Sequence, residues 1–180
     1  MSQNNKIVVV YKSKSGFTKT YATWLAEELK GDLKEAKNVK AEEFKSYDTI
    51  IYGGGMYAKS INGAKLITKN YEQLKDKKLI LFAVGSTPVR EETNMFIKEA
   101  NIPANQIDHI NFFYLRGGFD YHKLTLIDKI LMSMLKVKLK NVKNPDADQK
   151  GLLAAYHQPL DFTKRKNIQP IIDCVGNHTS

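Results

Sequence analysis

Residues 13–18 combine hydroxyl side chains with a glycine in one short turn, and this combination suits the binding of a phosphate group. The turn follows an unbroken apolar run, Ile7 to Val10, and leads directly into a helical pattern. The first amides of a helix have no partner within the helix and lie at the positive end of its dipole, so an anion is favoured there. The hydroxyl groups add donors, and the glycine lets the backbone close around the anion. The candidate phosphate ligands are Ser13, Lys14, Ser15, Gly16, Phe17 and Thr18.

Lys14 adds a positive charge to this turn. Hydrogen bonds to a charged group contribute about 1.5–3 kcal/mol each, so several converging donors can hold a dianion without a lysine. We therefore expect Lys14 to assist phosphate binding rather than to be required for it. The alternative is that the turn is a serine-rich helix cap without a ligand, since Ser and Thr are common at that position.

The length of 180 residues fits one α/β domain spanning residues 1–180. The apolar runs are too short for a targeting segment or a membrane span, and the single Cys174 is consistent with a reducing compartment, so we expect a cytoplasmic protein. The net charge of +9, from 28 basic and 19 acidic residues, favours acidic proteins, anionic lipid or nucleic acid as partners. No nucleic-acid-binding motif accompanies the charge, so no nucleic-acid partner is expected.

The sequence offers no candidate residues for metal binding, nucleophilic catalysis or nucleoside-triphosphate binding. The four histidines lack the spacing of a metal pair or of a nucleophile relay, and no serine-hydrolase pattern is present. The segment from Gly53 to Ser60 approaches a nucleoside-triphosphate loop, but Ala58 stands where that loop requires glycine. We therefore assign no catalytic residue and no metal ligand.

Apolar runs that end in glycine-bearing segments alternate with helical patterns. This alternation indicates a parallel sheet with right-handed crossovers. The expected strands are Ile7 to Val10, Leu33 to Ala36, Tyr47 to Gly53, Leu79 to Val84 and Ile110 to Leu115. The expected helices between them are Phe17 to Leu29, Ala64 to Leu74 and Val89 to Ala100.

The segments that follow the later strands are candidate walls of a ligand site. In open sheets of this kind, ligands bind beyond the carboxyl ends of the strands, where the strand order reverses. Arg116 either faces the site or packs at the end of its strand. The candidate wall residues are Gly54, Gly55, Met56, Tyr57, Gly85, Ser86, Thr87, Pro88, Arg116, Gly117 and Gly118.

The spacing S-x-S-G-x-T after the first strand resembles the phosphate-binding signature of the flavodoxin family. The resemblance implies an open, doubly wound α/β fold whose five-stranded parallel sheet has the order 2-1-3-4-5, with helices on both faces. It also implies FMN as the cofactor, with the loop from Ser13 to Thr18 on the phosphate and Phe17 contributing only its backbone. The loops Gly53 to Tyr57 and Gly85 to Pro88 then flank the isoalloxazine ring, and Tyr57 is the side chain expected to stack on it.

The segment Tyr114 to Tyr121, followed by a lysine-rich helix, resembles the flavodoxin-domain branch that includes menaquinone-dependent protoporphyrinogen oxidase. This resemblance implies an FMN-dependent oxidoreductase that passes electrons to a membrane quinone. Two alternatives stay open. One is a soluble electron carrier that serves a redox partner protein and has no substrate of its own, and the other is a flavin-free scaffold.

A helix of about four turns is expected from Leu124 to Lys140, with apolar residues on one face and lysines on the other. Two interpretations fit this pattern: peripheral contact with an anionic surface at the inner face of the membrane, or an outer helix of the α/β domain. A polar loop is expected from Asn141 to Lys150, and a last helix from Thr163 to Val175 in which Pro170 causes a kink or a later start. The apolar set is Ile127, Ile130, Leu131, Met134 and Leu135, and the lysines are Lys129, Lys136, Lys140 and Lys143.

Overall fold

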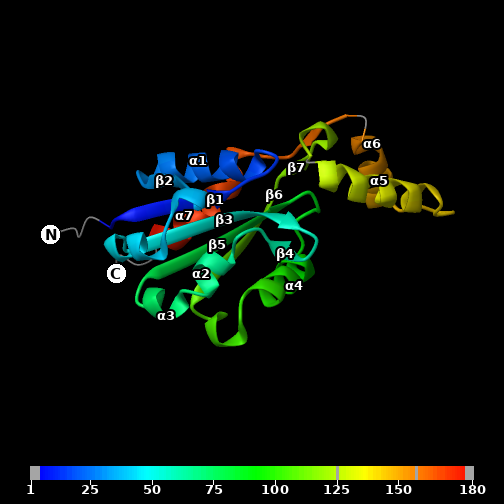
Figure 1. Cartoon of the computed structure of the whole chain (residues 1–180). Helices are drawn as coiled ribbons and strands as arrows, with labels where there is room; N and C mark the ends of the chain where they lie inside the picture. The colour runs from blue at the N-terminus through cyan, green and yellow to red at the C-terminus, as the bar shows by residue number, and fades with distance from the viewer. Residues whose placement is uncertain (1–4, 125, 157, 177–180) are drawn as a thin grey trace.

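The computed structural model describes residues 5–124, 126–156 and 158–176. At its centre lies a parallel sheet with the order β2-β1-β3-β5-β6, and a short strand β4 pairs antiparallel with the end of β3 (Figure 1). The expected five-stranded order 2-1-3-4-5 is therefore confirmed, since β4 stands outside the series. The strands are β1 (Ile7–Lys12), β2 (Asp32–Glu35), β3 (Thr49–Tyr57), β4 (Ser60–Ile61), β5 (Lys78–Gly85) and β6 (Ile110–Arg116).

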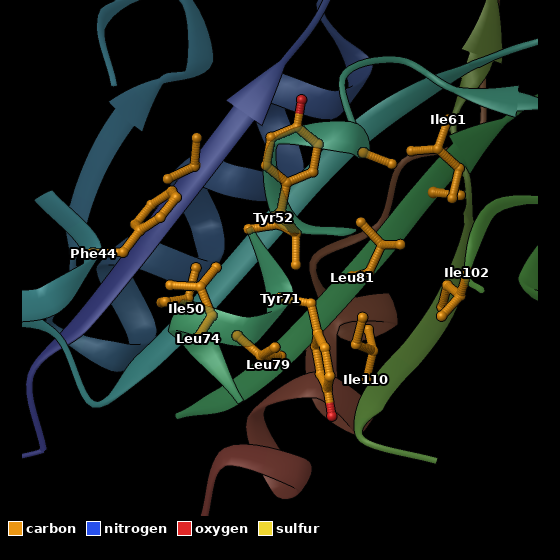
Figure 2. Packing of buried hydrophobic residues seen from close by; sticks show 14 of the residues in the cluster. Phe44, Ile50, Tyr52, Ile61, Tyr71, Leu74, Leu79, Leu81, Ile102 and Ile110 are labelled. Atoms are coloured by element: carbon orange, nitrogen blue, oxygen red, sulfur yellow. The ribbon is translucent and has the colours of Figure 1, made fainter. Parts of the chain in front are cut away.

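Helices cover both faces of the sheet because its strands are apolar on both sides. Val9 packs in the cluster that includes α1 and α7, whereas its neighbour Val8 packs in the cluster beneath α2, α3 and α4. Figure 2 shows part of the second cluster, where Tyr71 and Leu74 lie over Leu79. The helices on the first face are α1 (Phe17–Leu29) and α7 (Gln169–Gly176), and those on the second are α2 (Lys65–Thr68), α3 (Tyr71–Leu74) and α4 (Glu91–Asn101).

Tyr52, in the middle of β3, is fully buried, and its hydroxyl donates a hydrogen bond to the Asn62 carbonyl at 2.9 Å. Burial raises the pKa of Tyr52 above the ordinary tyrosine value of about 10. Above pH 10 the unfolded chain therefore loses a proton that the folded chain retains, and the free energy of unfolding falls by up to about 1.4 kcal/mol per pH unit from this group. In Tyr52→Phe we expect a shallower alkaline slope, measured by urea unfolding between neutral and alkaline pH. An unchanged slope would contradict this assignment.

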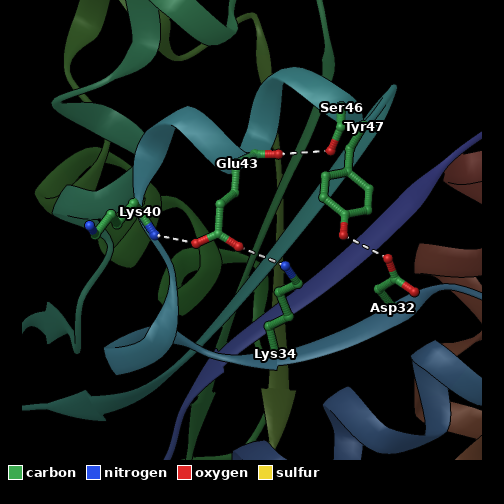
Figure 3. Close-up of polar contacts among 6 residues, drawn as sticks. All are labelled: Asp32, Lys34, Lys40, Glu43, Ser46 and Tyr47. Carbon is green, nitrogen blue, oxygen red and sulfur yellow. Dashed lines mark hydrogen bonds and ion pairs between the residues drawn. The ribbon is translucent and has the colours of Figure 1, made fainter.

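The edge strand β2 is joined to the turn before β3 by polar contacts (Figure 3). The Glu43 carboxylate accepts from Lys34 Nζ at 2.7 Å and from the Lys40 backbone at 2.9 Å, and the bond from Lys34 is the main cause of the lowered pKa of Glu43. The Tyr47 hydroxyl donates to Asp32 Oδ2 at 2.6 Å. These contacts join the edge strand β2 to the segment that leads into β3.

Two expected elements differ in the structure. The helix expected from Ala64 to Leu74 is split into α2 and α3, because the Asn70 side chain bonds back to the Leu66 carbonyl at 2.9 Å and so competes with the regular helical pattern. The prediction of a loop from Asn141 to Lys150 is wrong from Ala147 onward, where a helix begins. Asp146 and Gln149 form a capping box that starts α6 (Ala147–Ala155).

A pair of helices leaves the sheet and returns to it through a two-stranded ribbon. β7 (Gly118–Phe119) pairs antiparallel with β8 (Leu160–Asp161), and α5 (Leu126–Lys140) and α6 lie between them in the chain. In Figure 1 both helices extend away from the sheet, beyond the ends toward which the strand arrows point. The Tyr156 hydroxyl donates to the Met132 carbonyl at 2.6 Å and so joins the two helices. No helix in the described part of the chain is long and apolar enough to cross a bilayer.

The last helix follows a short 3-10 turn and begins at Gln169, so Pro170 occupies its first turn, where no hydrogen bond is lost. The later start is therefore confirmed in place of the kink. The 3-10 segments of the chain are Ala36–Asn38, Ala41–Ser46, Ala104–Gln106, Tyr121–Lys123 and Arg165–Ile168.

Candidate cofactor site

A cavity of about 660 Å³ lies at the carboxyl ends of the central strands. This volume falls in the range of about 300–1,000 Å³ that is typical of small-molecule sites. Its lining comes from the turn after β1, the β3–β4 hairpin, the segment after β5 and the start of β7, together with side chains from α4 and α5. The cavity therefore lies where the fold places ligands.

The turn after β1 is shaped for an anion. Gly16 precedes α1 with a φ of 98°, a left-handed conformation that favours glycine, and no side chain caps the amides of the first helical turn. The Ser13 hydroxyl accepts a hydrogen bond from the Gly16 amide at 3.1 Å and so orders the turn. The amides that follow remain available to a ligand.

Thr18 supplies the most specific feature of this turn, which we call the phosphate cradle (residues 13–18). The residue is only 3% exposed and lines the cavity, and its hydroxyl makes no hydrogen bond to any described residue. The hydroxyl oxygen is not among the fully enclosed unpaired atoms of the described chain, so it can donate a hydrogen bond to an acceptor in the cavity. A Cβ added to Gly55, across the cavity, would lie 3.4 Å from Thr18 Oγ1, so a side chain there would narrow the cradle. The residues present therefore fit a phosphate group.

Lys14 connects the cradle to α5. Its Nζ lies 3.1 Å from Asp128 Oδ2 and 4.6 Å from the centre of the Tyr57 ring. Asp128 is 8% exposed at its side chain, whereas Lys14 is 50% exposed, so the lysine contacts solvent and the cavity together. The ion pair holds the base of α5 beside the expected phosphate position.

We expect Lys14→Gln to weaken FMN binding by no more than about fivefold, because a half-exposed charge contributes about 1 kcal/mol or less. A titration followed by flavin absorbance measures the dissociation constant. Lys19→Gln removes an exposed charge from α1 outside the cavity lining and serves as the control. Complete loss of binding in Lys14→Gln alone would show that the charge is required.

Most of the candidate residues meet at the cavity. Those that line it are Lys14, Ser15, Phe17, Thr18, Gly55, Met56, Tyr57, Gly85, Ser86, Thr87 and Gly118. Those outside the lining are Ser13, Gly16, Gly54, Pro88, Arg116 and Gly117. Arg116 packs at its strand end, with its guanidinium 3.7 Å from the centre of the Phe162 ring and its Nε donating to the Ser86 carbonyl at 3.2 Å. The ligand role of each residue stays a prediction.

Glycines 53–55 lie inside β3 rather than in a loop. A Cβ on Gly53 would lie 2.0 Å from Phe82 Cζ, so close packing between β3 and β5 accounts for the first glycine. The turn itself falls at Ala58 and Lys59, between the paired residues Tyr57 and Ser60. Because this segment forms a hairpin, the near match to a nucleoside-triphosphate loop has no helix at its end.

Sequence reasoning missed the apolar roof of the cavity. Leu131, Met132 and Leu135 of α5 line it together with Phe96 of α4 and Phe119 of β7. The helical pattern assigned Leu131 and Leu135 to an apolar face but gave no indication that this face meets a cavity instead of the sheet. Within residues 5–124, 126–156 and 158–176, no group of three or more potential metal-binding side chains is found.

Comparison with known proteins found several similar solved structures. No match to a curated protein was found. Solved structures that resemble the chain include the Trp repressor binding protein from Bacillus subtilis (17% identity, 62% of this chain and 83% of that chain, TM-score 0.47) and oxidised flavodoxin 2 from Bacillus cereus (24%, 62% and 85%, TM-score 0.42). A flavoprotein from Lactobacillus acidophilus in complex with FMN is also similar (18%, 62% and 92%, TM-score 0.39).

The family itself is established by sequence. A model of the flavodoxin domain, for which FMN is the typical cofactor, matches residues 8–146. The match covers the cradle, the β3 segment, the end of β6 and α5. The chain therefore belongs to the flavodoxin-domain family.

Proposed function

We propose that this protein is an FMN-dependent oxidoreductase that passes electrons from its flavin to a quinone. The observation that carries the proposal is the apolar roof that α5 places over the cavity, formed by Leu131, Met132 and Leu135. A carrier that serves only other proteins needs an accessible flavin edge, whereas an enzyme for an apolar ring needs an apolar compartment beside the flavin. The roof supports the second arrangement.

The cradle residues would hold FMN by its phosphate. The amides at the start of α1, with the hydroxyls of Ser15 and Thr18, supply the donors, and Tyr57 lies on the β3 wall where a planar ring can stack. When bound, FMN supplies the capacity to accept and donate one or two electrons. The polypeptide contributes binding and orientation.

The roof gives an apolar acceptor a place to bind. Phe96 and Phe119 add aromatic surface to the α5 side chains that line the cavity. A quinone becomes a quinol by gaining two electrons and taking up two protons, and water supplies the protons in this proposal. Tyr114 is a poor proton donor, because burial raises the pKa of its hydroxyl, which already donates to the Thr87 carbonyl at 3.0 Å.

The branch that includes menaquinone-dependent protoporphyrinogen oxidase is the proposed place of the chain within the family. The resemblance in residues 114–121 supports this placement, and the helix that follows belongs to the roof. A tetrapyrrole as electron donor belongs to the same proposal, because the net charge of +9 favours a substrate with carboxylates.

Reoxidation kinetics test the proposal. The flavin-loaded protein is reduced without oxygen and mixed with either a water-soluble menaquinone analogue or an oxidised redox protein. We expect fast reoxidation by the quinone and at least about tenfold slower reoxidation in Met132→Gln with Leu135→Gln, with FMN still bound, because polar groups in the roof disfavour an apolar ring. Val137→Gln, on the exposed side of α5, is the control. Fast reaction with the redox protein alone would establish a carrier instead.

A further inference from the structure

One face of α5 is apolar and exposed. Leu126, Ile130, Met134 and Val137 are between 56% and 76% exposed, and they follow one another at intervals of four, four and three residues. This spacing places them on one side of the helix. The opposite side is turned inward, toward the cavity and the body of the protein, and carries Asp128, Met132, Leu135 and Leu139.

The helix α5 therefore has two apolar faces, whereas the sequence pattern predicts one. Ile130 and Met134 lie on the exposed face, and Leu135, which the pattern places on the same stripe, lies on the inward face. An outer helix of an α/β domain buries its stripe on the sheet, but α5 packs mainly against α6. The outer-helix interpretation is thus wrong for this segment.

Lysines border the exposed face of α5. Lys129, Lys136 and Lys140 lie along one flank, and Lys138 lies on the other. The aliphatic stems of lysines can cover apolar surface while their ammonium groups reach polar surroundings. The one acidic residue of α5, Asp128, is buried on the opposite side and paired with Lys14. The exposed face therefore combines apolar side chains with positive charge.

We propose that α5 binds the surface of an anionic lipid bilayer, with Ile130 and Met134 at the boundary between headgroups and acyl chains. An apolar stripe flanked by lysines is the pattern of helices that lie in the membrane interface. The negative surface of such a bilayer contributes about 1 kcal/mol for each nearby lysine. A second copy of the chain fits this face less well, because two molecules that each carry +9 repel one another.

The lipid contact stands on α5 alone and does not depend on a bound flavin. It has a structural consequence for the cavity, however. The side chains of α5 that line the cavity and those that face the bilayer belong to the same four turns, so the bilayer lies next to the roof. An apolar molecule dissolved in the membrane then has a short route to the cavity.

Vesicle flotation with the full-length protein tests this proposal. Vesicles contain either phosphatidylcholine alone or phosphatidylcholine mixed with anionic phosphatidylglycerol. We expect binding to the mixed vesicles that weakens as salt rises, and little binding to phosphatidylcholine alone. Ile130→Gln with Met134→Gln should reduce the partition coefficient at least about tenfold, because two exposed apolar side chains no longer enter the interface.

Two further variants separate α5 from general charge. Lys138→Gln with Lys140→Gln should reduce binding about 25-fold, which is about fivefold for each lysine. Lys65→Gln with Lys69→Gln removes the same charge at exposed positions in and next to α2, and should have a clearly smaller effect. Equal effects of the two pairs, or no flotation of the wild-type protein, would overturn the proposal. Dimerisation that the Ile130 and Met134 substitutions abolish, without lipid binding, would assign this face to a second copy.

Discussion

Aspartate at positions 15 and 18 together abolishes FMN retention while the fold survives. Ser15→Asp with Thr18→Asp removes two hydroxyl donors and places two carboxylates against the phosphate. Hydrogen bonds to a charged group contribute about 1.5–3 kcal/mol each, so the dissociation constant should rise at least about a hundredfold before repulsion is added. Flavin absorbance of the protein after gel filtration measures retention, and circular dichroism measures the fold.

Two control variants define the cause of this loss. Ser15→Ala with Thr18→Val removes the hydroxyls without adding charge, and it should weaken binding less than the aspartate pair. Ser46→Asp with Gln73→Asp adds the same charge at exposed positions outside the cavity lining and should leave FMN bound. Retention of FMN by a folded Ser15→Asp, Thr18→Asp protein would refute the assignment of the cradle.

Gly53→Ala should be strongly destabilising. The added Cβ would lie 2.0 Å from Phe82 Cζ and 2.5 Å from both ε-carbons of a ring that is completely buried. Overpacking of a core costs about 1–3 kcal/mol, and we expect the upper end because β3 and β5 are hydrogen-bonded neighbours that cannot separate. For a chain of this size, a loss of about 3 kcal/mol lowers the melting temperature by roughly 6–12 °C, which calorimetry detects.

A second substitution should rescue part of this loss. Phe82→Leu removes the ring atoms that meet the new Cβ, so Gly53→Ala should cost much less in the Phe82→Leu background than in the wild-type protein. The coupling free energy from the four proteins measures this contact. Additive effects would mean that the ring and residue 53 do not compete for the same space.

The strands of the sheet could be predicted because β-branched runs specify buried strands, whereas their order followed from the resemblance to flavodoxins. A hydroxyl- and glycine-rich turn before a helix favours an anion, and this local signal indicated the turn of residues 13–18, most of which line the cavity; their binding of phosphate stays a prediction. Tyr57 and residues 85–87 could be predicted to lie beside this turn because they follow parallel strands, and parallel strands end at one edge of the sheet.

The roof could not be predicted, because it depends on how distant segments meet. The two faces of α5 differ in their surroundings rather than in their composition: Met134 is exposed and Met132 lines the cavity, although both are methionines on one helix. The ribbon of β7 and β8, which sets the position of α5, pairs residues 118–119 with residues 160–161. Short pairings between such distant segments have no local sequence signal. The sequence does contain a signal for α6, the capping box of Asp146 and Gln149, but the polar composition around it favours a loop.

Calorimetric titration of the flavin-free protein with FMN and with riboflavin tests the central claim most directly. The two ligands share the isoalloxazine ring, but riboflavin lacks the phosphate that the cradle is proposed to hold. We predict one FMN per chain, bound at least about a hundredfold more tightly than riboflavin, because several hydrogen bonds to a charged group are lost with the phosphate. Equal affinities for the two ligands, or no binding of FMN, would contradict the account of residues 13–18 as a phosphate cradle.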